Sequence, residues 1–375
     1  MRFGSVCSGI EAATVAFTGW DAAWLAEIEP FPCAVLSHRY PTVPNLGDMT
    51  TIAKRILLGE VEAPDVLCGG TPCQSFSIAG LRGSLSDDRG NLTLKFIEIA
   101  NAIDHVRSGR GQQPTIAIWE NVPGVLNTED NAFGCFLAGL AGESVPLIAT
   151  VGKWSNAGCV YGPARSIAWR VLDAKHFGVP QSRKRIFLVS SARKGFDPAE
   201  VLFEFGSSRR DSETSSQEAR GVAPDPADLL GVCGIEQSTH RMINIGGYVE
   251  DDTAGTVKAR DWKDATDLVA YNITFCDANG TRQDRRDGGV YINETQVSGS
   301  VLRGGAGTSV ADSHSIRRLT VGECESLQGF PQGHTNVPWR GKPDSPDGLR
   351  YKALGNSWAV PVAAWVGKRV NEYLA

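Results

Sequence analysis

The sequence predicts an α/β fold, with a mostly parallel sheet flanked by helices and a smaller, irregular β-rich region. Short apolar runs alternate with helix-like stretches in the first half, which is typical of strand–helix–strand units. Polar residues follow these runs where each strand would end, and residues 241–312 form short Gly- and Thr-rich pieces. A chain of 375 residues has room for two or three domains at roughly 100–200 residues each.

The first half supplies the sheet and its helices. Strands are expected at residues 1–9, 21–30, 61–72, 115–125 and 185–192, and helices at residues 10–17, 31–41 and 92–106. In the last of these helices, Leu94, Ile97, Ala100, Ile103 and Val106 recur at helical spacing. Ligands bind at the carboxyl ends of the strands in such sheets, so the polar residues there predict a site.

The second half is organised differently. Ser, Pro and charged residues dominate residues 206–226, which predicts a linker or surface loop. Residues 242–249, 253–259, 267–275, 288–293 and 298–304 are β-like, and helical patterns return at 320–331 and 352–374. We divide the chain into a domain at 1–200, a linker at 201–226, a β-rich domain with hinge at 227–340 and a C-terminal helix within 341–375.

Composition excludes several classes of protein. A hydrophobic content of 42% excludes global disorder, and no apolar run reaches the ~18 residues of a membrane span. The start of the chain lacks the pattern of a secretory signal, and nine cysteines without a CxxC pair indicate a reducing compartment and no zinc ribbon. We therefore expect a cytoplasmic protein that binds no metal and no membrane.

Charge is unevenly distributed along the chain. The net charge is −5, yet residues 160–195 contain eight Lys and Arg against Asp173 alone. A local basic face of this kind binds phosphates even when the whole chain is acidic. The alternative is an ordinary solvated surface.

Two predicted strand ends carry candidate catalytic residues, a thiol and an acid. Cys73 follows the strand at 61–72, in GGTPCQSFS, where an exposed cysteine near a helix start becomes a thiolate nucleophile. Glu120 ends the apolar strand IAIWEN, where desolvation favours the protonated carboxyl, which can donate a hydrogen bond to a ring nitrogen. A buried thiol and a capping Glu are the respective alternatives, and Cys68 fits the core better than Cys73 does.

Two further patterns indicate ligand contacts. Gln181, Arg183 and Arg185 alternate along an extended segment, and two arginines on one face suit phosphate or carbonyl oxygens. Gly9 follows the first strand, and Glu27 and Asp48 follow at the spacing of groups that hold a nucleoside. Since only one glycine of the dinucleotide pattern is present, we expect a nucleoside-type cofactor without a pyrophosphate.

These motifs together resemble the DNA cytosine-5 methyltransferases. The matching segments, in family order, are VCSGIEA, AEIEP, LGDMT, GGTPCQSFS, DDRGNL, ENV, QSRKR, RRLTVGECESLQGFP and ALGNS. They cover residues 1 to about 195 and about 316 to 375. The combination is far more specific than any one motif.

The resemblance implies a Rossmann-like methyltransferase domain that binds S-adenosyl-L-methionine. The residues it assigns to the cofactor are Cys7, Ser8, Gly9, Ile10, Glu27, Ile28, Asp48, Met49, Leu92, Asn356 and Ser357. Those it assigns to the substrate are Pro72, Gln74, Ser77, Asn121, Val122 and Gln181.

The resemblance also implies a mechanism. Cys73 adds to C6 of a cytosine flipped out of double-stranded DNA, and protonated Glu120 binds N3. Arg185 contacts the cytosine carbonyl oxygen, and Arg183 contacts a phosphate or the loop that carries Cys73. The variable slot at 200–315 corresponds to a target-recognition domain, and the C-terminal helix returns to the catalytic sheet.

The implied partners are duplex DNA, bound by a monomer, and a cognate restriction endonuclease. Three alternatives stay open: an RNA cytosine-5 methyltransferase, a catalytically inactive DNA-binding relative, and a thiol hydrolase. An amino-methyltransferase is disfavoured because its Asn/Asp-Pro-Pro-aromatic motif is absent.

Overall fold

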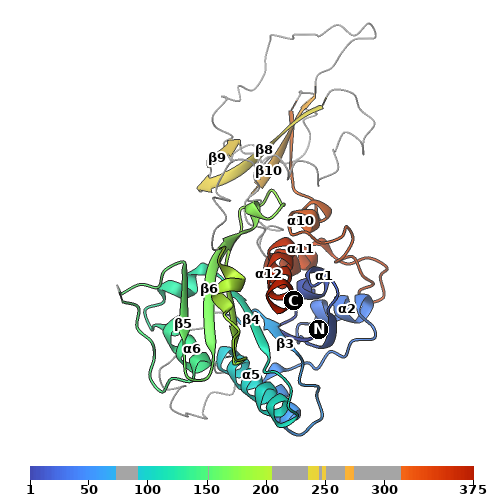
Figure 1. Cartoon of the computed structure of the whole chain (residues 1–375). Helices are drawn as coiled ribbons and strands as arrows, with labels where there is room; N and C mark the ends of the chain where they lie inside the picture. Colours follow the sequence, from blue (N-terminus) through green and yellow to red (C-terminus); the bar gives the residue numbers. More distant parts are fainter. Residues whose placement is uncertain (73–91, 151, 205–234, 245–246, 251–266, 274–313) are drawn as a thin grey trace, which may run out of the picture.

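Figure 1 shows the computed structural model, which describes residues 1–72, 92–150, 152–204, 235–244, 247–250, 267–273 and 314–375. Its main body is a seven-stranded sheet in the order β2-β1-β3-β4-β7-β6-β5. The strands are β1 (Arg2–Val6), β2 (Asp21–Ala26), β3 (Val66–Gly69), β4 (Ile116–Asn121), β5 (Ala157–Tyr161), β6 (Ser166–Asp173) and β7 (Lys184–Ser191). The predicted α/β architecture is confirmed.

The sheet is mixed, with a parallel half and an antiparallel half. The strands β2, β1, β3 and β4 pair in parallel, as the sequence predicts, whereas β7, β6 and β5 continue the sheet in antiparallel fashion. Helices separate the first four strands, and short connections join the last three, which permits only antiparallel neighbours. The strands β5 and β6 are not among those that the sequence predicts.

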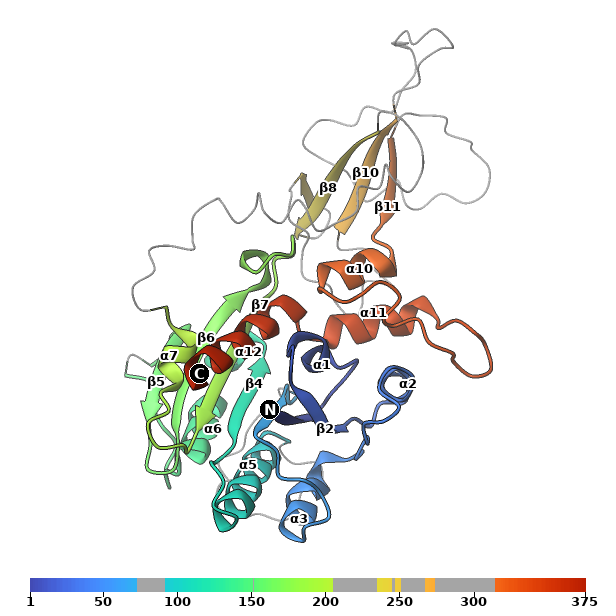
Figure 2. The ribbon, with the colours of Figure 1, turned by 45° about the vertical axis from the view of Figure 1, so that its right-hand side comes forward.

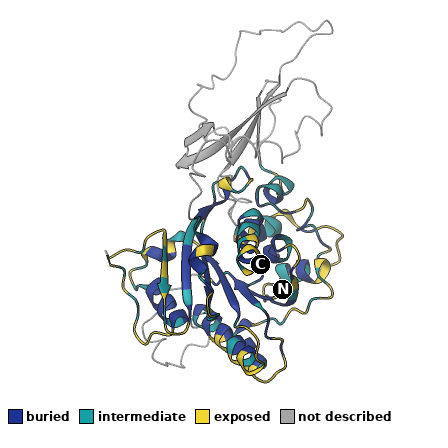
Figure 3. Cartoon of the chain, viewed as in Figure 1, coloured by how far each residue is buried: buried dark blue, intermediate teal, exposed yellow. Residues whose placement is uncertain are grey.

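Helices cover both faces of the sheet (Figure 2). One core contains α1 (Ala12–Ala16), α7 (Pro198–Leu202), α10 (Val321–Leu327), α11 (Asp347–Asn356) and α12 (Val360–Leu374). The other contains α3 (Ile52–Leu57), α5 (Leu92–Gly109) and α6 (Ala132–Ala141), and α2 (Pro30–Arg39) packs beside α11. Figure 3 shows the central strands as the most buried layer.

Strand alternation decides which face each side chain reaches. On β4, Ile116 and Ile118 lie in the α1/α12 core, and Ala117 and Trp119 lie in the α5/α6 core. This period of two places the next residue, Glu120, on the α1/α12 side. Cys68 on β3 is fully buried in the same core, as expected.

The C-terminal segment differs from the prediction of one helix over 352–374. The structure has two helices, α11 ending at Asn356 and α12 starting at Val360, so that prediction is wrong. Pro361 accounts for the break, because proline fits the first turn of a helix but not its interior. The α12 helix packs against α1, which brings the two ends of the chain together.

A second sheet has four antiparallel strands in the order β11-β10-β8-β9. They are β8 (Ile235–Asn244), β9 (Gly247–Glu250), β10 (Asp267–Ile273) and β11 (His314–Arg318), and Figure 1 shows them beyond α10. Most of the predicted linker at 201–226, and the β-like pieces at 253–259, 288–293 and 298–304, lie outside the described residues. Val321, Cys324 and Phe330 already pack in the core of the large sheet, ahead of the boundary drawn at residue 340.

Within the part of the chain that the structure describes, no helix combines the length and the apolar character that a bilayer crossing requires.

Candidate active site

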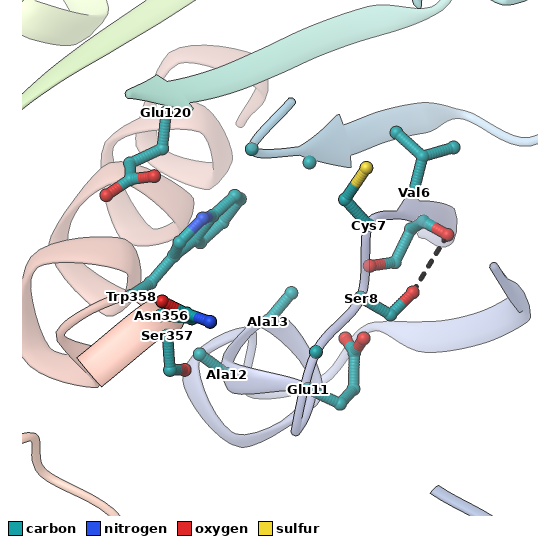
Figure 4. Close-up of a pocket in the computed structure, with 14 residues that line it drawn as sticks. Val6, Cys7, Ser8, Glu11, Ala12, Ala13, Glu120, Asn356, Ser357 and Trp358 are labelled. Carbon is teal, nitrogen blue, oxygen red and sulfur yellow. Dashed lines mark hydrogen bonds between the residues drawn. The ribbon is translucent and has the colours of Figure 1, made fainter. Parts of the chain in front are cut away.

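A cavity lies at the carboxyl ends of the parallel strands (Figure 4). Its lining comes from the end of β1, the loop after it and the start of α1, from Gly69 at the end of β3 and Gly70 after it, and from Glu120 on β4. Residues 356–358, at the end of α11 and in the turn before α12, complete it. Parallel strands end at one edge of a sheet, so residues far apart in sequence meet there. The cavity therefore lies where the polar strand ends predict a site.

The loop after β1 is held in an uncommon backbone conformation. Cys7, Gly9 and Glu11 have φ angles of 50°, 54° and 64°, in the left-handed region. The Ser8 hydroxyl donates to the Ser5 carbonyl at 3.1 Å and accepts from the Ala26 amide at 3.0 Å, which ties the loop to β2. The turn is thus fixed before any ligand arrives.

Five of the predicted cofactor residues meet at this cavity. Cys7, Ser8, Gly9, Asn356 and Ser357 all line it. The first three come from the β1 loop, and the last two come from the break between α11 and α12. The break that the sequence analysis missed is therefore what brings the GNS motif to the site.

Two other predicted cofactor residues lie close to that loop. The Glu27 carboxylate at the end of β2 accepts from the Gly9 amide at 2.8 Å and from the Ile28 amide at 2.8 Å. Met49 is buried, and its sulfur accepts from the Cys7 thiol at 3.6 Å. Both contacts place these residues directly behind the wall of the cavity.

The remaining predicted cofactor residues do not line the cavity. Asp48 is exposed and accepts from the Thr50 amide at 2.9 Å, and Ile28 is 70% exposed. Ile10 is fully buried in the α1/α12 core, and Leu92 packs against the opposite core at the start of α5. Ile10 therefore anchors the loop in this core and does not line the cavity.

Glu120 is one of two acidic residues in the described lining of the cavity, the other being Glu11. Its Oε1 lies 3.2 Å from Nε of Arg185, and its side chain is about one-tenth exposed. Burial raises the pKa of Glu120, while the positive charges of Arg185 and Arg183 lower it. The net direction is upward, so the protonated form of this acid is favoured relative to an exposed glutamate.

The chain that leads to Cys73 is anchored beside this acid. Asn121 donates to the Thr71 carbonyl at 2.9 Å, and Trp119 donates to the Thr71 hydroxyl at 2.9 Å. Pro72 is exposed at the end of this anchored stretch, and Val122 is partly exposed after β4. Cys73, Gln74 and Ser77 lie outside the described residues.

The segment with Gln181 and Arg183 reaches the C-terminal part of the chain. Gln181 donates to the Leu327 carbonyl at 2.8 Å. The Arg183 guanidinium donates to the carbonyls of Gly355 and Ser357 at 2.9 and 2.6 Å, and it is 2% exposed. The structure thus places Arg183 against the turn that lines the cavity.

The prediction that residues 160–195 form a basic surface is wrong for the arginines described next, which make internal contacts. Arg165 is buried in an ion pair with Asp104 at 2.7 Å, and Arg193 donates to the Pro114 carbonyl at 2.6 Å. Arginine has five donors in a fixed fork, which suits it to such internal carbonyl and carboxylate contacts. Lys175, Lys184 and Lys194 are exposed.

Eight of the 14 described lining residues were not assigned from the sequence, and Glu11 and Trp358 are the two of these with an acidic or aromatic side chain. Glu11 is fully buried, caps α1 through the Thr14 amide at 3.0 Å, and has its pKa raised to about 7 by burial. Trp358 lines the cavity beside Glu120 (Figure 4). The signal available for Trp358 was its place directly after the GNS motif.

Comparison with known proteins identifies the family. The family model for C-5 cytosine-specific DNA methylases matches residues 1–372. The chain is 44% identical over 99% of its length to "DNA N-6-adenine-methyltransferase" of Escherichia phage P1, and it spans 61% of the length of that protein. It is 26% identical over 88% of its length to "Type II methyltransferase M.HpaII" of Haemophilus parainfluenzae, covering 77% of that protein.

Solved structures agree at the level of the fold. The Dnmt2 methyltransferase of S. pombe superposes with a TM-score of 0.53 at 14% sequence identity, with 99% of this chain and 98% of that chain covered. The Rossmann-like methyltransferase fold is therefore confirmed, as is S-adenosylmethionine as the cofactor of the family. The chain belongs to the C-5 cytosine-specific DNA methylases.

Proposed function

We propose that this protein methylates C5 of a flipped-out cytosine within a specific sequence of double-stranded DNA. The observation that carries the proposal is the pairing of Glu120 with Arg185 in a cavity at the strand ends, beside the anchored backbone that leads to Cys73. In this position an acid of raised pKa can donate a hydrogen bond to a pyrimidine ring, and the sequence supplies the thiol, Cys73, directly after Pro72.

The residues around the cavity fit S-adenosylmethionine. Gly9 lines the cavity, and a Cβ atom added there would meet nothing within 4 Å, so the loop leaves open space at this residue. Glu27 beside it offers carboxylate oxygens of the kind that accept ribose hydroxyls, and Asn356 and Ser357 offer polar groups to the amino-acid end. When bound, the cofactor supplies a methyl group on a positively charged sulfur.

The residues of this chain would carry out the other steps of the reaction. The Cys73 sulfur forms a bond to C6 of the cytosine, while Glu120 donates a hydrogen bond at N3 and Arg185 contacts the carbonyl oxygen. Electron density then moves to C5, which would form a bond to the methyl group as the methyl–sulfur bond of the donor breaks and leaves a neutral thioether. A base removes the C5 proton, the C6–sulfur bond breaks, and the Cys73 thiolate is regenerated. Extrusion of the base is required because a stacked cytosine exposes neither face to the sulfur.

Arg183 and Asp48 take supporting roles in this proposal. Arg183 holds the turn that presents Asn356 and Ser357, rather than contacting DNA itself. Asp48, exposed just before the short helix at Met49–Thr51, and Ile28, exposed two residues after β2, are proposed to border the adenine of the cofactor. The four-stranded second sheet lies in the slot of the target-recognition domain.

Adenine methylation is the second candidate, because the phage P1 relative is named for it. That relative is longer than this chain, and the Asn/Asp-Pro-Pro-aromatic motif of amino-methyltransferases is absent from the sequence. We therefore propose cytosine as the target, with adenine and RNA as outcomes to be tested.

The test is covalent capture on duplex DNA that carries 5-fluorocytosine, with S-adenosylmethionine present. The wild-type protein should form a stable adduct, and Cys73→Ala should bind DNA without forming one. Mass spectrometry of nucleosides from methylated DNA separates 5-methylcytosine from N6-methyladenine, and a tRNA transcript tests the RNA alternative. Adenine or RNA products without an adduct would overturn the proposal. Bisulfite sequencing then gives the recognised site.

A further inference from the structure

Trp358 is the single aromatic side chain among the described residues that line the cavity. Its indole lies on the same side as Glu120, across the cavity from the loop with Cys7 (Figure 4). The ring is 8% exposed, so it forms part of the wall rather than of the outer surface. Trp358 has no role in the proposed steps of the methyl transfer.

The structure fixes this ring firmly. The ring packs edge-on against Phe187, with centroids 5.8 Å apart and planes at 76°. The turn that carries it is held by Arg183 at the Ser357 carbonyl and by the Val360 amide, which donates to the Gln328 carbonyl at 2.8 Å. An aromatic ring that is immobilised in this way can act as a preorganised binding surface.

The ring stands next to the reacting groups. A Cβ atom built on Gly70 would lie 3.1 Å from the indole Nε1 of Trp358 and 3.0 Å from Oε2 of Glu120. The indole and the catalytic acid therefore approach the same point, which only a glycine at position 70 leaves open. This point follows β3 directly, two residues before Pro72.

The charge of the cavity favours a cation. Its described lining contains no Lys, Arg or His side chain, and it contains the carboxyl groups of Glu11 and Glu120. Burial raises the pKa values of both acids, which weakens their attraction for a cation relative to that of exposed carboxylates. The face of an indole attracts a cation without any titration, more strongly than Tyr or Phe does.

We propose that the Trp358 ring recognises the positively charged sulfonium of S-adenosylmethionine and thereby distinguishes the methyl donor from the neutral thioether product, S-adenosylhomocysteine. The inference rests on the cofactor of the family, and it is independent of the Cys73 chemistry. Its consequence is that product binds less tightly than donor, which favours product release.

The experiment compares dissociation constants for the two ligands by calorimetry on the full chain without DNA. In Trp358→Leu, the preference for S-adenosylmethionine over S-adenosylhomocysteine should fall by about three- to thirtyfold, while S-adenosylhomocysteine binding changes little. Trp358→Phe should keep most of the preference. Trp365→Leu, a matched change on α12 whose ring packs on Phe177 outside the cavity, should leave both constants unchanged.

A second measurement avoids side-chain truncation. Growth on fluorinated tryptophans replaces all nine Trp residues and weakens the cation attraction of each ring in steps, with little change of shape. Affinity for S-adenosylmethionine should fall with each fluorine, affinity for S-adenosylhomocysteine should not, and the trend should vanish in Trp358→Phe. Thermal unfolding of each variant reports whether it folds.

Equal weakening of both ligands in Trp358→Leu, or a fluorine trend that persists in Trp358→Phe, would overturn the inference. A wild-type protein that binds both ligands but makes no 5-methylcytosine would defeat the proposed function instead. In that case the ratio of the two constants would still decide the role of Trp358.

Discussion

The parallel and antiparallel halves of the large sheet contribute to the site in different ways. The parallel half, β1 to β4, delivers groups directly at its strand ends, namely the β1 loop, Gly70 and Glu120. The antiparallel half delivers Arg183 and Arg185, which act by holding something else: a turn in one case and an acid in the other. The groups that line the cavity therefore lie at strand ends, whereas the supporting groups act through contacts with residues elsewhere in the chain.

The largest effect should come from the parallel half. Glu120→Gln keeps the size of the side chain but removes the acidic proton, so turnover should fall about 10²- to 10³-fold. Because Glu120 is proposed to bind the base and not the cofactor, the dissociation constant of S-adenosylhomocysteine should stay within about threefold. Single-turnover methylation and calorimetry give the two numbers. A loss of cofactor affinity with normal turnover would show that the role of Glu120 is misassigned.

The β1 loop offers a test through pH. Burial raises the pKa of Glu11 from its ordinary value of 4.5 to about 7, and the nearby Ser5 and Ser8 hydroxyls oppose this rise. Between those two pH values the folded protein retains a proton that the unfolded chain has lost, so stability should fall as pH rises through that window, by up to about 3 kcal/mol. Urea unfolding at a series of pH values measures it.

Glu11→Gln is the matched control for that titration. The amide keeps an acceptor for the Thr14 amide and hydroxyl, both of which donate to Glu11 Oε1 in the structure. The variant should therefore fold, and the fall in stability between pH ~5 and ~7 should be absent from its profile. An unchanged profile would mean that another group titrates there.

Two matched substitutions, Arg183→Met and Arg185→Met, test the antiparallel half of the sheet. Arg183→Met leaves the carbonyls of Gly355 and Ser357 without their donor, which should cost about 1–3 kcal/mol of stability and weaken cofactor binding at the turn. Arg185→Met should instead lower turnover with the cofactor constant unchanged, since Arg185 contacts Glu120. Identical profiles for the two variants would remove the distinction drawn between them.

The smallest effect is expected at the edge of the parallel half. Asp48 is exposed, and the one described hydrogen bond of its side chain is the cap on the Thr50 amide, whose loss costs about 0.5–1 kcal/mol. Asp48→Ala should weaken cofactor binding by about tenfold, the loss of a single hydrogen bond to a polar ligand group, with unchanged turnover at saturation. If turnover falls and affinity does not, Asp48 has no part in cofactor binding.

The contrast between the halves also explains what the sequence could predict. Apolar runs that end in Gly9 or Glu120 reveal both the sheet and its ligand edge, because burial and strand ends are local properties. The partners of Arg183 lie more than 170 residues away, so no local pattern could distinguish an internal donor from a phosphate contact. The same holds for Arg165. It lies in a segment with eight Lys and Arg residues, which resembles a DNA-facing surface, and the sequence does not reveal its internal ion pair with Asp104.

The break between α11 and α12 was missed for a related reason. Residues 352–374 carry a continuous helical pattern, and Pro361 is the only strong interruption. A proline is tolerated in a first turn, so its presence alone does not say which side of it the helix ends on. The docking of Asn356, Ser357 and Trp358 at the cavity decides the matter, and that is a tertiary effect.

The shared wall of the cavity bears on how the protein is made. One side comes from residues 5–9 and 11–13 and the opposite side from residues 356–358, so synthesis must pass residue 358 before the pocket is complete. Contacts of such long sequence separation form late and slow the final stage of folding. A ligand in this cavity can stabilise the sheet only after residues 5–9 and 356–358 have met, so it gives the nascent sheet no earlier protection from proteases.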